Sequence, residues 1–155
     1  MFKSNNFFHL ILYTFKRILL FFYKMSIVKT FNEHFMEFVN DMLVVFPRNA
    51  EILLGKTALI GIKKINPSLL IRYWYDYVNT PYKEDIEKGD IEFFINKDYS
   101  QDVKDFEDPG YFLKAIDRFR EPIRNMQQDN KEKALQYVKN LCVLSDMYHK
   151  EKHGF

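Results

Sequence analysis

The sequence predicts an all-α fold, a single-domain helical bundle of about six to seven helices around a buried central helix over residues 66–79. Two observations predict this class. Apolar residues recur at the three- and four-residue spacing of helices, and prolines and capping residues separate the periodic segments. Within 66–79, apolar residues cover almost the whole circumference, which is typical of a helix inside a bundle. A chain of 155 residues can bury one core without a disulfide or a metal.

The central segment carries its own start and stop residues. Asn66 can cap a helix, Pro67 suits the first helical turn, and Pro81 is expected to end the helix. The helical period places the polar residues of the segment on one narrow stripe, which consists of Ser68, Arg72, Asp76 and Asn79. The remaining side chains are expected to be buried.

Residues 1–24 are apolar and basic and differ from the rest of the chain. Lys16 and Arg17 interrupt the apolar run near its middle, which disfavours a simple membrane span. Three interpretations remain open: an extension outside the domain with translation starting at Met25, an interfacial or signal-anchor segment, and a packed first helix. An interfacial helix would have a polar face made of His9, Tyr13, Lys16, Arg17 and Lys24.

The helical domain is predicted to span residues 27–149 and to be followed by a flexible tail over 150–155. Its first helix is expected to begin at Thr30, because Thr30 and Glu33 form a capping pattern ahead of a periodic apolar run. Pro47 is expected to stop that helix.

Capping residues predict further helix boundaries. N-caps are expected at Asn49, Asp90 and Asp108. Gly89 is expected to close a short helix over 82–88, because glycine readily adopts the left-handed conformation of a C-terminal cap. Residues 91–95 also resemble a strand, but such a strand would be isolated, so a helix is favoured. The helix after Asp108 is expected to continue, kinked, through Pro122.

Aromatic and acidic residues alternate through residues 81–99, where we expect a partner-binding surface. Aromatic side chains can anchor a partner, and the surrounding carboxylates would select a basic one. The candidate residues are Tyr82, Asp90, Glu92, Phe93, Phe94, Asp98 and Tyr99. The alternative is structural: the phenylalanines close the end of the bundle and the acids cap short helices.

The basic residues of the C-terminal third suggest an alternative nucleic-acid surface. Its candidates are Arg118, Arg120, Arg124 and Lys131. Acidic residues are interleaved with them, which is typical of a solvated face with ion pairs. The net charge of +2 also argues against a dedicated nucleic-acid binder.

No motif for a phosphate loop, a nucleophile elbow or a zinc site is present, so no catalytic residue and no cofactor are predicted. Cys142, Asp146, His149 and His153 share one helical stripe. Its ends lie about 16 Å apart at the helical rise, too far for one ion, so no metal is predicted. The carboxylates of residues 82–108 lack the spacing of a calcium loop.

Four stretches resemble a group of small uncharacterised proteins of nucleocytoplasmic large DNA viruses. They are F-P-R-N (46–49), K-K-I-N-P-S-L-L-I-R-Y-W-Y-D-Y-V (63–78), P-Y-K-E-D-I-E-K-G-D-I-E-F-F (81–94) and K-D-Y-S-Q-D (97–102). The resemblance implies a viral protein of the infected-cell cytoplasm, associated with the virion or the viral factory. It implies no catalytic residue.

The sequence therefore predicts a non-enzymatic helical protein that acts as a protein-interaction or structural module with an unknown, basic protein partner. The alternative is a nucleic-acid-associated accessory factor, and the third interpretation is an enzyme without a recognisable motif. Membrane association is expected only if residues 1–24 are translated and interfacial.

Overall fold

Helices form all the regular structure in residues 4–153, the part of the backbone that the computed structural model describes; side chains are described for residues 9–150. The elements are α1 (Ser4–Val45), α2 (Ala50–Ile65), α3 (Leu69–Trp74), the π-helical η1 (Tyr75–Asn79), α4 (Thr80–Lys88), α5 (Ile91–Asn96), α6 (Pro109–Arg124) and α7 (Gln128–His153). The prediction of an all-α domain is confirmed.

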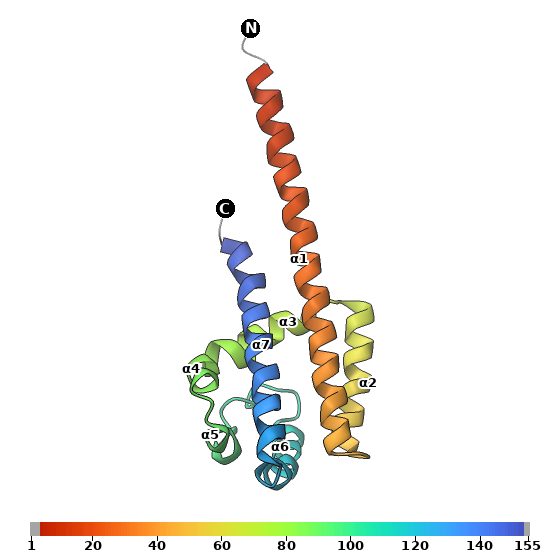
Figure 1. The fold of residues 1–155 in the computed structure, drawn as a ribbon, viewed down its shortest axis with the longest axis vertical. Coiled ribbons are helices and arrows are strands. Elements are labelled where there is room, and N and C mark those ends of the chain that lie inside the picture. The colour runs from red at the N-terminus through yellow and green to blue at the C-terminus, as the bar shows by residue number, and fades with distance from the viewer. Residues whose placement is uncertain (1–3, 154–155) are drawn as a thin grey trace.

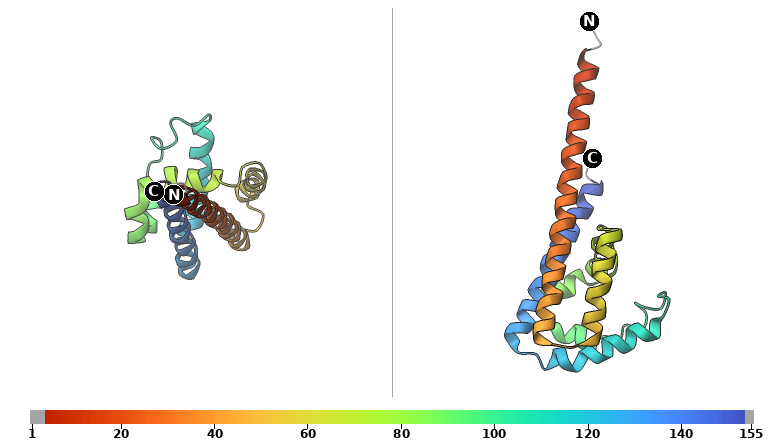
Figure 2. Two further views of the ribbon diagram at one scale, coloured as in Figure 1. Left: turned by 90° about the horizontal axis from the view of Figure 1, so that it is seen from above. Right: turned by 90° about the vertical axis from the view of Figure 1, so that its right-hand side faces the viewer.

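The long helix α1 is the axis of the molecule. α7 runs antiparallel along one side of its C-terminal half and α2 along another (Figure 1). α6 crosses beneath the end of the bundle that lies opposite the chain termini (Figure 2). The N-terminal half of α1 projects beyond all the other helices. Among the described residues, no helix is long and apolar enough to cross a membrane.

α1 is one continuous helix, so the expected helix start at Thr30 is wrong. Residues 1–46 contain neither proline nor glycine, and Thr30 lies exposed within the helix without interrupting it. The expected stop is confirmed, because α1 ends at Val45, two residues before Pro47. Burial in α1 starts at Ile27 and Val28.

The core lies where α1, α3 and α7 meet. Its fully or almost fully buried residues are Ile27, Val28, Phe31, Ile71 and Leu141. Trp74 covers this cluster, with its ring edge-on to Phe35 at 5.4 Å between centroids and to Phe31 at 6.2 Å. Aromatic pairs in this geometry add to the stabilisation that burial provides.

The central segment differs from the expected single helix that ends at Pro81. α3, η1 and α4 follow one another without a break, and Pro81 lies in the first turn of α4. In η1 the Thr80 amide donates to the carbonyl of Tyr75, five residues back. This wider turn precedes Pro81, which has no amide hydrogen to donate and would crowd a normal helical turn.

Burial around the central segment also differs from the expected pattern. Asn79, assigned to the polar stripe, is 1% exposed, whereas Tyr73 and Tyr77, assigned to the buried face, are 52% and 55% exposed. Only Ile71 and Asn79 are buried in α3 and η1. The segment therefore presents one side to α1 and α7 and the other side to solvent.

The caps predicted at Asn49, Asp90 and Asp108 are confirmed, but the cap predicted at Asn66 is wrong, because Asn66 is the C-cap of α2 and α3 begins at Leu69, after Ser68. The side chains of Asn49, Asp90 and Asp108 accept the amide hydrogens of Ile52, Phe93 and Tyr111 at 3.0, 3.1 and 3.0 Å. Gly89 closes α4 with φ at 73°. Residues 91–95 belong to α5, so the competing strand does not form. α6 ends at Arg124, two residues after Pro122.

Asp41 joins α1 to α7 through two donors. Its carboxylate accepts the Tyr137 hydroxyl at 2.7 Å and the Lys133 ammonium at 2.7 Å. The Lys133 ammonium, followed by the Tyr137 hydroxyl, lowers the pKa of Asp41 below its ordinary value. The same contact raises the pKa of Tyr137 to about 12.

Asp41→Asn is expected to lower the free energy of unfolding by about 0.5 kcal/mol at neutral pH, because the interaction is partly exposed and screened by solvent. A carboxyl whose pKa is lowered by folding stabilises the fold above its unfolded pKa of about 3.9, and this contribution is lost as pH falls through the folded pKa. Urea unfolding from neutral to acidic pH should show parent and variant converging at the acidic end. A constant difference would contradict this assignment.

Candidate functional site

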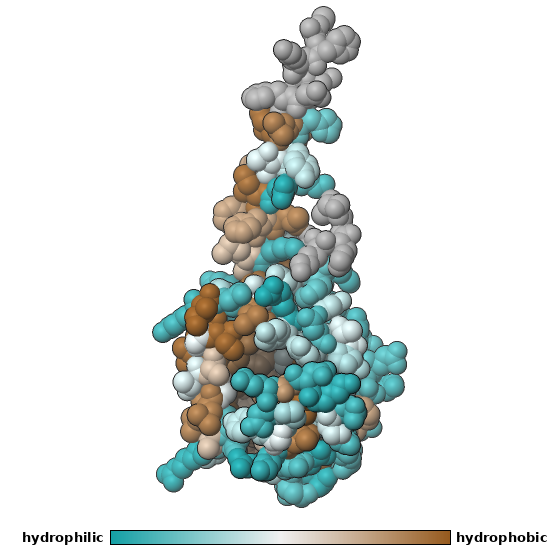
Figure 3. Space-filling model, turned by 180° about the vertical axis from the view of Figure 1, so that it is seen from behind, coloured by the Kyte–Doolittle hydropathy of each residue, from teal (hydrophilic) through white to brown (hydrophobic). Residues whose placement is uncertain are grey.

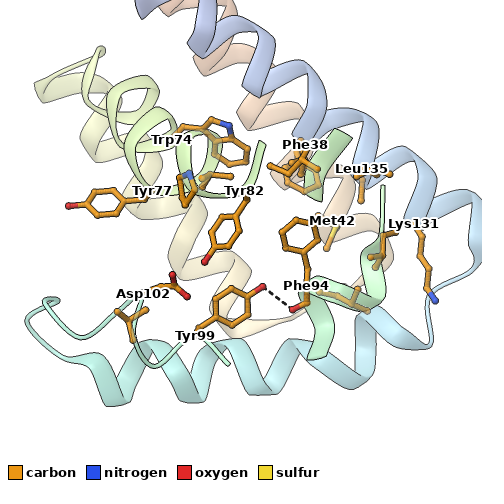
Figure 4. Close-up of a pocket in the computed structure, with 18 of the residues that line it drawn as sticks. Phe38, Met42, Trp74, Tyr77, Tyr82, Phe94, Tyr99, Asp102, Lys131 and Leu135 are labelled. Atoms are coloured by element: carbon orange, nitrogen blue, oxygen red, sulfur yellow. Dashed lines mark hydrogen bonds between the residues drawn. The ribbon is translucent and has the colours of Figure 1, made fainter. Parts of the chain in front are cut away.

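An apolar cavity of about 600 Å³ opens between α1, the α3–η1–α4 segment, α5, α6 and α7 (Figure 4). We call it the α4–α7 cavity. Its walls are almost entirely aliphatic and aromatic, and its charged lining residues are Asp76, Asp102 and Lys131. Cavities of this size and character are typical of sites that bind apolar groups.

Each helix contributes to the walls through residues on one face. Phe38 and Met42 are separated by one turn of α1, and Ala134 and Val138 by one turn of α7, so each pair faces the cavity together. η1 and α4 contribute Tyr77 and Tyr82, among others. Because these segments are far apart in sequence, the cavity exists only in the assembled bundle.

Three of the residues that the sequence predicts as partner-binding meet in this cavity. Tyr82 lies edge-on to Phe94 at 5.9 Å and to Tyr99 at 6.5 Å between ring centroids. The Tyr99 hydroxyl donates to the carbonyl of Phe94 at 2.8 Å and holds the loop after α5 against that helix (Figure 4). Three of the seven residues predicted as partner-binding therefore line the α4–α7 cavity.

The Tyr82 hydroxyl is a polar group available inside the cavity. Its oxygen is shielded from solvent and has no hydrogen-bond partner among the described residues. Burial, followed by the neighbouring Asp102 carboxylate, raises the pKa of Tyr82 well above its ordinary value, so the hydroxyl keeps its proton.

The remaining predicted partner-binding residues lie outside the cavity. Phe93 packs against Phe94 and is 36% exposed. Asp90 caps α5, Glu92 accepts from Asn96 at 3.3 Å, and Asp98 accepts from the amide of Ser100 at 2.9 Å. These acids have local structural contacts and also place negative charge near the cavity.

A second cavity of about 720 Å³ lies between α1, α2, α5 and α6. Glu51, Lys56 and Arg120 are its charged lining residues. The two cavities share a wall made of Phe38, Met42, Ile91, Phe94, Tyr99 and Ile123. The side chains of this wall therefore separate the two cavities.

The residues of the alternative nucleic-acid surface contact acceptors within the chain. Arg118 pairs with Glu51, and Arg124 with Glu121. Arg120 donates to the carbonyls of Ile95 and Lys97, and Lys131 donates to that of Arg124 at 2.7 Å. The Arg120 contacts hold α6 against α5 and the loop after it, whereas Arg118 joins α6 to α2 and Lys131 joins α7 to α6. Phosphate binding would have to compete with these contacts.

The stripe of Cys142, Asp146 and His149 contacts the α3–η1–α4 segment. Trp74 Nε1 donates to Cys142 Sγ at 3.4 Å, and His149 stacks on the Tyr75 ring at 3.6 Å between centroids. Burial raises the pKa of the Cys142 thiol. Within the described residues, no three His, Cys, Asp or Glu side chains converge on a metal position; the side chain of His153 lies outside them.

Asp146 is the charged residue of α7 that contacts the α3–η1–α4 segment. It accepts from Asn79 Nδ2 at 2.7 Å and pairs with Lys83 at 2.8 Å. The same Asn79 nitrogen lies 3.1 Å from Ser145 Oγ. The sequence did not predict this network, because Asn79 and Lys83 are more than 60 residues from Ser145 and Asp146 and nothing in the local pattern connects the two pairs.

No protein-family model matches the chain, and no curated protein or solved structure does. Its fold and its site therefore describe the protein: it is an all-α protein with a large apolar cavity. The argument for function rests on that cavity.

Proposed function

We propose that this protein is a non-enzymatic interaction module whose α4–α7 cavity receives apolar side chains from a helical segment of a partner protein. The observation that supports the proposal most is the apolar lining of a cavity of about 600 Å³. Apolar side chains that enter the cavity would exchange contact with water for contact with its aliphatic and aromatic walls, which is favourable. An amphipathic helix would supply such side chains from its apolar face.

The charge around the cavity suggests the chemistry of the partner. Residues 82–108 contain ten acidic and four basic side chains. Asp76 and Asp102 belong to the lining itself. A partner helix with basic residues beside its apolar face would complement this surface and be steered toward it. The resemblance to proteins of large DNA viruses supports a viral setting, with the partner in the infected-cell cytoplasm or the virion.

Trp74 provides a direct test, because it is the single tryptophan and it lines the cavity. The full chain would be titrated with two synthetic amphipathic helices that share one apolar face, one flanked by lysine and the other by glutamate. We expect the lysine-flanked helix to change Trp74 fluorescence and to bind at least about tenfold more tightly, a difference of about 1.4 kcal/mol. Equal affinities, or no binding, would contradict the proposal.

Filling the cavity provides a matched test. Ala134→Phe places a ring in the α4–α7 cavity, and the added apolar contacts are expected to keep or raise the melting temperature while peptide binding is lost. Ala58→Phe, in the second cavity only, is the control and should leave peptide binding unchanged. If Ala134→Phe folds and still binds the lysine-flanked helix, the cavity is not the binding site.

Two alternative functions have different expected results. A long-chain fatty acid that changes Trp74 fluorescence, where neither peptide does, would assign the cavity to a small apolar ligand. Salt-sensitive retention on DNA or RNA, lost in Arg118→Gln with Arg124→Gln, would favour the nucleic-acid alternative.

A further inference from the structure

The projecting half of α1 exposes an unusual amount of apolar surface. Eleven large apolar or aromatic side chains between residues 10 and 25 are 45 to 62% exposed: Leu10, Ile11, Leu12, Tyr13, Phe15, Ile18, Leu19, Phe21, Phe22, Tyr23 and Met25. Figure 3 shows this apolar surface on the part of α1 that extends beyond the body. Contiguous exposed apolar surface of this kind marks a contact with a membrane or a protein.

The helical period separates this segment into two faces. Apolar side chains occupy one wide face, whose central row is Ile11, Phe15, Ile18 and Phe22, with Leu12 and Leu19 beside it. The basic residues Lys16, Arg17 and Lys24 lie on the opposite side, which they share with Tyr13 and Leu20. The Arg17 guanidinium lies 5.8 Å from the centroid of the Tyr13 ring, and the Lys24 ammonium lies 5.4 Å from that of Tyr148, so Lys24 faces α7.

The width of the apolar face favours a flat surface over a second helix. The central row alone has the four-three-four spacing of a coiled-coil seam. Leu10 and Phe21 on one flank, and Leu12 and Leu19 on the other, would remain exposed in a two-stranded coil. A lipid interface contacts the central row and both flanks at once, and large apolar residues opposite Lys and Arg are typical of interfacial helices.

The charge of the segment identifies the kind of lipid. No Asp or Glu precedes Glu33 in the sequence, whereas Lys16, Arg17, Lys24 and Lys29 all lie before it. Long basic side chains on the upper face of an interfacial helix can reach lipid headgroups. Such residues are attracted to anionic leaflets. The first acids appear where α1 enters the body of the protein.

A cavity at the base of the projecting segment adds a second observation. It has a volume of about 750 Å³ and lies between α1, the end of α7 and the α2–α3 connection. Lys24, Lys29 and Lys63 line it, beside Phe21 and Met25. The single acid in its lining is Glu33, which lies 3.9 Å from Lys29. This combination of cationic and apolar groups suits an anionic headgroup with its acyl chains alongside.

We propose that residues 9–25 of α1 bind the surface of an anionic bilayer, with the apolar face in the interface and the basic side toward the headgroups. This segment is about 25 Å long at the helical rise, and it would lie along the bilayer surface. This inference concerns a different surface from the α4–α7 cavity and goes beyond the proposed function.

Vesicle flotation tests the proposal with the full chain. We expect co-flotation with vesicles of phosphatidylcholine mixed with phosphatidylserine, little with phosphatidylcholine alone, and release by salt. Lys16→Gln with Arg17→Gln should weaken partition about thirtyfold, at roughly fivefold for each basic residue near the surface. Phe15→Ser with Phe22→Ser should abolish it. Circular dichroism would confirm that both variants fold.

The control removes the same charge elsewhere. Lys104→Gln with Lys114→Gln changes two exposed lysines near the far end of the bundle and should leave partition unchanged. Ala134→Phe, which tests the cavity, should also leave it unchanged, so the two proposals fail separately. Absence of flotation, or equal flotation with both lipid compositions, would overturn the proposal. So would a dimer in sedimentation that Phe15→Ser with Phe22→Ser dissociates, because the apolar face would then belong to a second copy of the chain.

Discussion

Replacing Phe31 by alanine is expected to lower the free energy of unfolding by about 3–5 kcal/mol, the usual cost of truncating a fully buried phenylalanine. Phe31 has 0% exposure and lies at the centre of the contact between α1, α3 and α7. Its ring stacks on Phe35 at 6.0 Å and meets Trp74 edge-on at 6.2 Å between centroids. The truncation would leave a cavity that these rigid rings cannot close. Urea unfolding measures the loss.

Phe22→Ala is the matched control, because it makes the same substitution in the same helix at a residue that is 62% exposed. In the absence of lipid its free energy of unfolding should stay within about 0.5 kcal/mol of the parent. Similar losses for both variants would mean that the projecting half of α1 packs against the body in solution.

Replacing Asn79 by aspartate is expected to lower the free energy of unfolding by about 3–5 kcal/mol at neutral pH, because it places an uncompensated charge in a buried site. Asn79 is 1% exposed, and its amide nitrogen donates to Asp146 at 2.7 Å, to Ser145 Oγ at 3.1 Å and to the carbonyl of Cys142 at 3.3 Å. Aspartate removes this donor and sets a second carboxylate against Asp146.

The destabilisation by Asn79→Asp should depend on pH. Burial and the Asp146 carboxylate both disfavour ionisation, so the folded pKa of the new carboxyl is raised above its unfolded value of about 3.9. The cost of ionisation is therefore absent below the unfolded pKa and grows as pH rises toward the folded pKa. Urea unfolding at a series of pH values measures it.

Asn79→Ala is the control for this pH dependence. It removes the same donor without adding a titratable group, so its cost should change much less with pH over the same range. If the two variants lose equal stability at every pH, the added charge does not reach the buried site that the structure shows.

The sequence by itself determined the helical class and several helix ends. The caps at Asn49, Asp90 and Asp108, and the left-handed residue Gly89, were predicted because each depends on contacts within a few residues. The stop before Pro47 was predicted for the same reason. The sequence also singled out three aromatic residues that line the cavity, Tyr82, Phe94 and Tyr99. These three residues lie within one short segment of the chain.

Only the tertiary structure decided which helix faces are buried. Helical periodicity shows that a segment has an apolar side but does not identify the neighbour that covers it. Asn79 is buried because three acceptors on α7 meet its side chain, whereas Tyr77 remains half exposed although its residue type suits a core. The π-helical turn of η1 also rotates α4 relative to α3, and a regular period of 3.6 residues cannot predict that rotation.

The sequence predicted neither the full length of α1 nor the position of the α4–α7 cavity. A capping pattern at Thr30 could begin a helix, but nothing upstream breaks one, so the chain stays helical from Ser4 and Thr30 caps nothing. The cavity is enclosed by segments that extend from Phe38 to Val138 along the chain. A local sequence pattern shows which residues are apolar, and only the packing of distant helices determines which of them line the same cavity.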